Sequence, residues 1–308
     1  MTWRIEDHHL AAARSAIADH LSPTPLRRAP QLGDDVWLKL ECLQVTGSFK
    51  VRGALTKMAS LSSEERAAGV VTASAGNHGL GVAFAAARLG IHARILVPAE
   101  TPVVKRDGIA RAGAEVVVCP EPGYDDVEAR ALELARASGA TFVSAFDDPF
   151  VAAGNGGTVG DELQAQLEGI EVIVCPVGGG GMVCGLAAAF PSPQLIGVNT
   201  DASPGMARSF AEGRALERLP PATTLAEGLE GGVREATYRL AREAGVKMTT
   251  VGEDAIADAM RFARDELSLV VEGSGAVGIA YVRARTVVGR TVVVVTGSNV
   301  DEERLNKV

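Results

Sequence analysis

The sequence has few aromatic residues and no excess of positive charge. Phe, Trp and Tyr make up only 4% of its 308 residues, whereas Gly occurs 35 times. This composition predicts an interior of Ala, Val and Leu that packs closely against glycine-rich loops. The formal net charge is −8, and both nucleic acids and anionic membranes require a basic protein surface. We therefore expect neither as a partner.

Signals for membrane insertion and secretion are also missing. No segment approaches the roughly 18 consecutive apolar residues that a transmembrane helix needs. The first residues, Met1 to Asp7, lack the apolar region of a signal peptide. The default expectation is a cytoplasmic protein.

Cysteine and histidine form no pattern typical of a metal site. The four cysteines are widely spaced without a C-x-x-C pair, so we expect buried apolar thiols. His8 and His9 are adjacent in the first predicted helix, residues 5–20, and are expected to be solvated. No metal site is therefore predicted. The cysteines are Cys42, Cys119, Cys175 and Cys184.

Strands and helices alternate along most of the chain. Such alternation predicts parallel sheets covered by helices on both faces. Residues 201–235 are rich in Gly, Pro and charge and are predicted to be irregular. The pattern contains no repeat of fixed period and no long linker. Strands are predicted at 36–41, 69–72, 93–97, 114–118, 141–143, 171–176, 194–198, 247–251 and 291–295.

The turn Gly178 to Gly181 follows the predicted buried strand at 171–176 and precedes a helix. Its glycines expose backbone N–H groups, and the helix N-terminus adds partial positive charge, so the turn can bind a phosphate. The G-x-G-x-x-G spacing of a dinucleotide site is poorly met, and no Lys-Ser/Thr pair closes a Walker loop. We therefore favour a phosphate that is not part of a nucleotide. A nucleotide-binding Rossmann protein is the alternative.

Two further turns carry polar side chains. The backbone N–H groups of Ser74 to Gly79 and the Ser74 hydroxyl can bind a carboxylate, and Asn77 can hydrogen-bond a phenolic oxygen. Ser74 also fits the N-cap position of the next helix. Thr296 to Asn299 ends the last strand and offers a hydroxyl that could meet a ring nitrogen. Ligands bind at the carboxyl edge of open α/β sheets, so the three turns can face one crevice.

Lys50 lies in the segment Gly47 to Ala54, at the start of a predicted helix. An isolated lysine is usually a solvated surface charge. In a dry pocket, however, a lysine loses part of its proton affinity and can form a Schiff base with an aldehyde cofactor. Together with the phosphate, carboxylate and hydroxyl turns, Lys50 completes the set of groups that a pyridoxal phosphate enzyme needs.

The chain resembles the fold-type II pyridoxal phosphate enzymes over nearly its whole length, in particular the threonine/serine dehydratase and serine racemase branch. The resemblance implies an α/β fold of two domains, each an open, twisted, mostly parallel sheet with helices on both faces (tryptophan synthase β-like). Residues 1–66 and 146–308 would form a large cofactor-binding domain, and 67–145 a small mobile domain with the substrate loop. The matching segments are Thr24–Leu26, Leu38–Glu41, Thr46–Ala54, Ser74–Gly79, Pro176–Met182, Glu227–Gly228, Glu272–Gly278 and Thr296–Asp301.

The resemblance also implies roles for individual residues. Lys50 would be the catalytic Schiff-base lysine, Phe49 would pack beside the cofactor, and Asn77 would hydrogen-bond the ring oxygen O3′. Thr296 would bind the pyridine nitrogen. The phosphate would bind at Gly178, Gly179, Gly180, Gly181 and Met182. The substrate would contact Ser74, Ala75, Gly76, Asn77, His78, Glu227 and Gly228. The family further implies a homodimer.

The implied reaction is the dehydration of a 3-hydroxy amino acid such as L-threonine or L-serine. Lys50 removes the α-proton, the β-hydroxyl leaves, and hydrolysis gives a 2-oxo acid and ammonia. A hydroxyl rather than a carboxylate at Thr296 suits elimination over transamination. An amino-acid racemase is the rival within the branch, and a β-replacement synthase fits the lysine motif less well. A cofactor-binding protein without catalytic activity is the alternative from another class.

The sequence departs from the family pattern at several positions. Ala75 replaces the second serine that racemases use as an acid and base, which disfavours racemisation. The usual carboxylate of a divalent metal site is missing or displaced at 199–201, and a monovalent cation held by carbonyl groups stays an alternative. Gly273, Ser298 and the missing glutamine in Gly154–Thr158 can reshape the substrate pocket. Hydroxyaspartate or phenylserine is therefore an alternative substrate.

Overall fold

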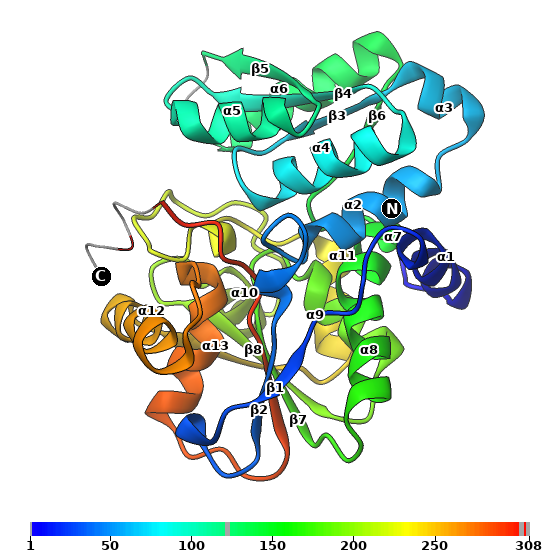
Figure 1. Cartoon of the computed structure of the whole chain (residues 1–308). Coiled ribbons are helices and arrows are strands. Elements are labelled where there is room, and N and C mark those ends of the chain that lie inside the picture. The colour runs from blue at the N-terminus through cyan, green and yellow to red at the C-terminus, as the bar shows by residue number, and fades with distance from the viewer. Residues whose placement is uncertain (1, 121–123, 302–304, 306–308) are drawn as a thin grey trace.

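The computed structural model describes residues 2–120, 124–301 and 305 and contains two sheets (Figure 1). Among the described residues, neighbouring strands are parallel except for the edge pair β1–β2. The predicted α/β fold with two mostly parallel sheets is confirmed. The six-stranded sheet has the order β1 (Leu26–Arg28), β2 (Val36–Lys39), β10 (Thr291–Val294), β7 (Val172–Pro176), β8 (Gln194–Thr200) and β9 (Lys247–Val251). The four-stranded sheet has the order β5 (Glu115–Cys119), β4 (Ala93–Pro98), β3 (Val70–Ala73) and β6 (Thr141–Phe142).

The six-stranded sheet is covered on both faces, as its apolar strands require. Side chains of β10 alternate between two cores: Val293 packs with α12 (Glu253–Leu267) and α13 (Gly273–Ala284). Val292 and Val294 pack on the opposite face. The helices of that face are α8 (Thr158–Gln166), α9 (Gly181–Ala189) and α11 (Glu235–Glu243). Figure 1 shows the two helix layers on either side of the sheet.

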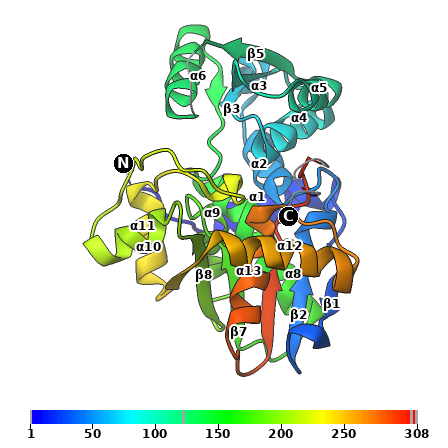
Figure 2. The same cartoon turned by 90° about the vertical axis from the view of Figure 1, so that its left-hand side faces the viewer.

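The four-stranded sheet has the same layered construction. Figure 2 shows α4 (Asn77–Leu89) and α5 (Val103–Arg111) on one face and α6 (Tyr124–Ser138) on the other. Apolar side chains of α2 (Lys50–Ala59), among them Leu55 and Met58, join the core on the α4 face. Helix α2 therefore connects the two sheets physically, and α3 (Ser63–Ala68) leads from it into β3.

Several helices were not predicted from the sequence, among them α10 (Gly205–Glu212) and α13. The prediction that 201–235 is irregular is wrong at α10, where Met206 and Ser209 are buried. The Ser209 hydroxyl donates to Gly205 O and accepts from Leu216 N–H. Helix α13 was overlooked because glycine lowers helix propensity, yet its glycines let it pack closely against neighbouring strands. In both cases tertiary packing outweighs local preference.

Helix α1 (Asp7–Ala18) modifies one expectation about histidine. His8 is exposed as expected, but His9 is buried, and its Nδ1 accepts the Glu6 N–H at 3.0 Å. The prediction that both are solvated is therefore wrong for His9, because it completes the capping of the helix. Ligand atoms of Glu6, His8 and His9 lie within 4.8 Å of one another.

Other sequence expectations can be checked directly. All four cysteines are buried thiols that form no disulfide, which confirms the prediction. Among the described residues, no helix has the length and apolar character needed to span a membrane. The remaining short elements are η1 (Pro30–Leu32), η2 (Glu41–Leu43), α7 (Pro149–Ala152), the π-helical turn η3 (Ala153–Gly157) and η4 (Glu227–Leu229).

Candidate active site

Lys50 is the first residue of α2, and the chain before it lies beside the end of β10. The Phe49 N–H donates to Thr296 O at 3.2 Å. The Lys50 amine donates a hydrogen bond to Ala145 O at 3.0 Å. Burial lowers the pKa of Lys50 to about 8, although the Glu272 carboxyl acts in the opposite direction. Roughly a tenth of the amine is therefore unprotonated at pH 7, far more than in a solvated lysine, which favours a role as nucleophile or base.

The turn Gly178–Gly181, named the glycine loop, joins β7 to α9. Gly180 has a φ of +95°, which residues with a side chain rarely adopt. A Cβ atom on Gly179 would overlap the Phe146 ring, so no side chain fits there. Helix α9 has no side-chain N-cap. The N–H groups of its first turn can therefore bind an anion such as a phosphate.

The turn Ser74–Gly79, named the asparagine loop, joins β3 to α4. The N-cap of α4 is Gly76, so the prediction that Ser74 caps this helix is wrong. Ser74 lies too far before the first helical residue, Asn77, and its Oγ accepts the Gly76 N–H at 3.2 Å instead. The helix N-terminus is left without a side-chain cap, like that of α9. Ala75 is half-buried and carries no group that can transfer a proton.

Asn77 is held by two side chains from the part of the molecule built around the six-stranded sheet: Glu272 at the start of α13 and Asn299 after β10. Its Nδ2 donates to Glu272 Oε1 at 2.7 Å, and its Oδ1 accepts from Asn299 Nδ2 at 2.7 Å. Asn299 also donates to Thr46 O at 2.9 Å. These contacts determine which end of the Asn77 amide is the donor. Among the described residues they use one of the two Nδ2 hydrogens, which leaves a second donor.

His78 is a buried, neutral imidazole next to the asparagine loop. Its Nε2 donates to Val143 O at 3.0 Å, because a carbonyl oxygen can only accept. Burial, together with the charge of Lys50, lowers the pKa of His78 to about 3. Nδ1 is buried and has no hydrogen-bond partner among the described residues. The ring thus offers an acceptor nitrogen.

Glu272 is a site residue that the sequence analysis did not single out. It is the N-cap of α13 and accepts the hydrogen bond from Asn77. Burial raises the pKa of Glu272 to about 7, the Asn77 hydrogen bond lowers it, and the nearby Glu227 raises it. An available signal was its place at the start of the segment Glu272–Gly278, which matches the family.

The structure brings the other predicted site residues to the same region. Ser48 and Gly297 form an isolated β-bridge, which places the end of β10 beside the lysine segment. The Gly228 N–H donates to Ser274 Oγ at 2.9 Å, and a Cβ on Gly178 would lie 3.2 Å from Gly228 O. Met182 is buried in the core, so only its backbone can contribute to the glycine loop.

Side chains at the end of β8 give the segment 199–201 a structural role. Asn199 is buried and hydrogen-bonds Val177 O and Ala207 N–H. The nearby Glu253 carboxylate accepts from Thr200 Oγ1 at 2.6 Å and Thr224 Oγ1 at 2.7 Å. Protein donors therefore satisfy this carboxylate within the described residues.

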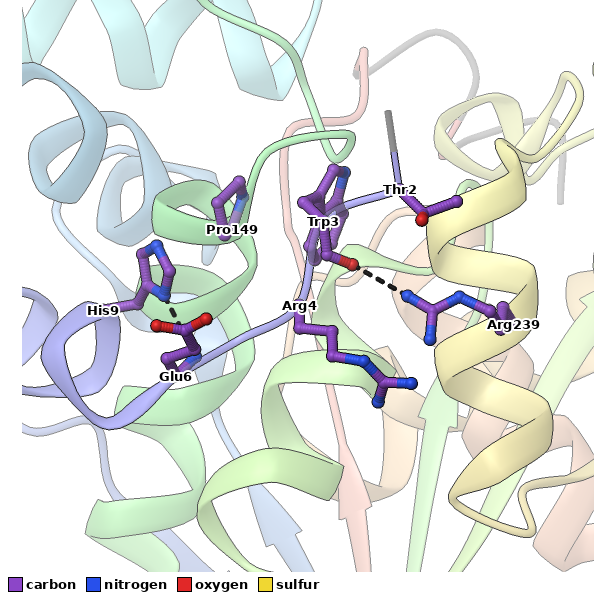
Figure 3. A pocket seen from close by; sticks show the side chains of 7 residues that line it. All are labelled: Thr2, Trp3, Arg4, Glu6, His9, Pro149 and Arg239. Carbon is purple, nitrogen blue, oxygen red and sulfur yellow. Dashed lines mark hydrogen bonds between the residues drawn. The ribbon is translucent and has the colours of Figure 1, made fainter.

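A separate hollow of about 570 Å³ lies beside the N-terminal segment (Figure 3). Arg239 Nη2 donates to Trp3 O at 3.0 Å, as the dashed line in Figure 3 shows. The Trp3 indole donates to Asp147 Oδ1 at 2.7 Å. The N-terminal segment thus braces the chain just before Pro149, which also lines the hollow.

Comparisons with known proteins agree with this geometry. A family model described as pyridoxal-phosphate dependent enzyme matches residues 17–297. The chain is 41% identical to an L-threonine ammonia-lyase of Thermotoga maritima over 285 residues, which cover 90% of this chain and 70% of that protein. The structure of threonine deaminase isoform 2 from Solanum lycopersicum has a TM-score of 0.91 and 34% identity, covering 99% of this chain and 94% of that one. Maize serine racemase has a TM-score of 0.92 and 28% identity, with 99% and 97% covered.

The described residues fit pyridoxal phosphate. The Lys50 amine has a lowered pKa, and the glycine loop presents backbone N–H groups where no side chain fits. His78 Nδ1 and the second Asn77 N–H remain for ligand contacts. The chain belongs to the pyridoxal-phosphate dependent enzymes, in the fold-type II family of threonine dehydratases and serine racemases.

Proposed function

We propose that the protein is an ammonia-lyase that eliminates water from a 3-hydroxy amino acid, L-threonine or L-serine, to give a 2-oxo acid and ammonia. The observation that carries this proposal is the Lys50 amine, with a pKa of about 8, beside the glycine loop and the asparagine loop. Relatives named L-threonine ammonia-lyase or threonine dehydratase support the reaction class. When bound, pyridoxal phosphate would supply a ring that withdraws electrons from the substrate Cα.

Lys50 is assigned two tasks. It holds the cofactor covalently, and as a free amine it removes the α-proton of the substrate. Phe49 packs beside the cofactor, and its ring centroid lies 5.2 Å from Lys50 Nζ. The second Asn77 N–H would bind the ring oxygen, and the Thr296 hydroxyl would bind the ring nitrogen. The backbone N–H groups of Gly178, Gly179, Gly180, Gly181 and Met182 bind the phosphate.

The asparagine loop is assigned to the substrate carboxylate. Ser74, Ala75 and Gly76 lie at the uncapped N-terminus of α4, whose N–H groups favour an anion. Asn77 and His78 follow in the first turn, and a neutral His78 adds a hydrogen-bonding group without adding charge. Glu227 and Gly228 border the opposite side, where Gly228 approaches the glycine loop.

Ala75 favours elimination over racemisation. A racemase must move a proton on both faces of the substrate, and a methyl group cannot do so. Racemases are nevertheless structural neighbours of this chain, including one described as an aspartate racemase with a TM-score of 0.87. A racemase is therefore the second candidate, and hydroxyaspartate and phenylserine are the alternative dehydration substrates.

The wider organisation is proposed from the family and from packing. Residues 67–145 would form the small mobile domain, and 1–66 with 146–308 the large one, with α2 as the contact between them. The exposed apolar side chains of Leu43, Val45 and Val270 support a homodimer. A cytoplasmic location and an amino acid as small-molecule partner complete the proposal.

The test is product formation from a panel of 3-hydroxy amino acids in both α and β configurations. Wild type and Lys50→Ala are compared, and 2-oxo acid, ammonia and the α-epimer are measured together. A lysine-dependent 2-oxo acid without epimer supports the dehydratase and identifies its substrate. Epimer with little 2-oxo acid favours the racemase. Absence of both products in wild type contradicts the proposal.

A further inference from the structure

The chain returns from the four-stranded to the six-stranded sheet through Val143–Asp148, named the crossover segment (Figure 1). The four-stranded sheet holds the first residue of this segment. Val143 N–H donates to Val71 O at 2.9 Å, and Val143 O accepts from Thr72 Oγ1 at 2.8 Å and His78 Nε2 at 3.0 Å. The start of the crossover segment is therefore fixed to the asparagine loop.

The far side of the crossover segment is fixed to the glycine loop. Phe146 packs so closely on this loop that a Cβ on Gly179 would overlap its ring, and one on Gly181 would lie 3.1 Å from Phe146 Cα. Ala145 lies between these two anchored residues, and its carbonyl accepts the hydrogen bond from Lys50. The main chain of the crossover segment thus touches all three parts of the site.

Ser144 closes a tight turn around the Ala145 peptide. Its Oγ accepts the N–H of Asp147 at 2.9 Å and the N–H of Phe146 at 3.4 Å. Serine commonly stabilises turns by accepting N–H groups two or three residues further on. Because these bonds enclose the Ala145 peptide unit, they determine where the Ala145 carbonyl points.

We propose that Ser144 is a positioning residue for Lys50, and that Ala145 O holds Lys50 whenever its amine is free. The inference rests on the proposed role of Lys50 as the lysine that binds the cofactor. When a substrate amine replaces Lys50, the C–N bond to Lys50 breaks and a C–N bond to the substrate forms. Two hydrogens of the incoming amino group end on Lys50.

The hydrogen count explains why this contact depends on the state of Lys50. A lysine nitrogen attached to the cofactor carries at most one hydrogen, whereas the free amine carries two. A carbonyl oxygen can engage one N–H and leave the nitrogen lone pair available to remove a proton. Ala145 O therefore stabilises the free amine without blocking it as a base, and so favours displacement of Lys50 by the substrate.

The experiment uses Ser144→Ala, Ser144→Thr and the matched control Ser62→Ala. Ser62 also accepts a backbone N–H, from Glu65 at 3.2 Å, but caps the exposed helix α3. Displacement of Lys50 in the holoenzyme is titrated by absorbance with alanine, which has no β-hydroxyl to lose. We expect Ser144→Ala to weaken displacement about tenfold, the effect of one lost hydrogen bond. Cofactor affinity measured without amino acid should change less than threefold.

A second measurement does not need the cofactor. Reductive methylation of Lys50 in the full-length apoprotein, followed by peptide mass spectrometry, reports how freely its amine reacts. We expect this rate to rise severalfold in Ser144→Ala, while Ser144→Thr and Ser62→Ala behave like wild type. Unchanged displacement and methylation in Ser144→Ala would overturn the proposal.

Two other outcomes separate this proposal from its alternatives. If displacement, cofactor affinity and melting temperature all fall together in Ser144→Ala, and threonine restores none of them, Ser144 is only structural and the proposal fails. If Lys50→Ala keeps the absorbance of bound cofactor, the proposed function of Lys50 fails. The methylation rates would then still decide whether Ser144 and Ala145 hold the amine.

Discussion

The glycine loop and the asparagine loop occupy equivalent positions but are held in place by different interactions. Each joins a buried parallel strand to a helix without a side-chain N-cap. The glycine loop is held by packing, because Phe146 fills the space where side chains of Gly179 and Gly181 would lie. The asparagine loop is more open, with no neighbouring atom within 4 Å of a Cβ on Gly76. Instead, Asn77 is held by a hydrogen bond that it donates to Glu272 and by one that it accepts from Asn299.

This difference indicates which part of the site can move. Close packing has one favourable arrangement and resists displacement, whereas hydrogen bonds can be exchanged for bonds to a ligand at little net cost. Two ion pairs also join the four-stranded side to the six-stranded side: Arg234 with Glu128 at 2.7 Å and Lys105 with Glu227 at 3.5 Å. An exposed pair such as Lys105–Glu227 contributes little. We infer that the glycine loop is rigid and that the asparagine loop can adjust to a bound ligand.

The substitution Gly179→Ala should have the largest effect on cofactor binding, because it disrupts the packing of the glycine loop. Its new Cβ would overlap the Phe146 ring and force the loop apart. We expect cofactor affinity to fall more than about a hundredfold, measured by equilibrium titration of the apoprotein with pyridoxal phosphate. The control is Gly108→Ala in α5, where the new Cβ makes only an ordinary contact at 3.8 Å from Leu80. Normal cofactor affinity in Gly179→Ala would show that the loop is not rigid.

Lys50→Met tests how much the buried amine lowers the free energy of unfolding of the apoprotein. Because the pKa of Lys50 is lowered from 10.5 to about 8, the unfolded chain binds more protons than the folded chain between these pH values. The free energy of unfolding of wild-type apoprotein therefore rises from pH 8 to pH 10.5, and below pH 8 the penalty is complete. We expect apo Lys50→Met to be more stable than wild type by about 2 kcal/mol at pH 7.

That advantage should shrink as the pH approaches 10, and urea unfolding at several pH values measures it. A stability difference that is the same at pH 7 and pH 10 would mean that the lysine is not buried as a charged group.

Glu272→Gln tests the hydrogen bond from Asn77 to Glu272 that holds the asparagine loop. Since the pKa of Glu272 is raised to about 7, its carboxylate forms as the pH rises through neutrality and becomes a stronger acceptor for Asn77. We expect kcat/KM of wild type to rise through pH 7 and that of Glu272→Gln to lack this inflection and to lie about tenfold lower at pH 8. Cofactor affinity should stay within threefold of wild type. An inflection that persists in the variant would assign it to another group.

Glu128→Gln should have the smallest effect. It removes one charge of the Arg234 ion pair between α6 and the six-stranded side. We expect KM to rise about threefold with little change in kcat, since the pair only biases the position of the small sheet. Glu133→Gln on the same helix, which breaks the exposed pair with Arg130, is the matched control and should leave KM unchanged. Equal effects of the two variants would exclude a role for the contact between the sheets.

The periodic parts of the chain could be predicted well. Apolar β-branched runs such as 291–295 identify buried parallel strands, and the turns after them locate the loops that face the site. Helix α13 was missed because its glycines lower helix propensity, and α10 because the segment around it is rich in Gly, Pro and charge. Ser74 was misplaced as a cap because helix starts are local features that vary by a few residues.

The sequence by itself determined the alternation of strands and helices, the glycine loop and the lysine segment, since each depends on neighbouring residues along the chain. Tertiary structure alone decided that Glu272 and Asn299 hold Asn77, and that Ala145 O meets the Lys50 amine. It also decided the pKa values of Lys50 and Glu272, because burial and nearby charges come from segments far apart in sequence. Local pattern selects the elements, whereas desolvation and contacts between distant segments create the chemistry.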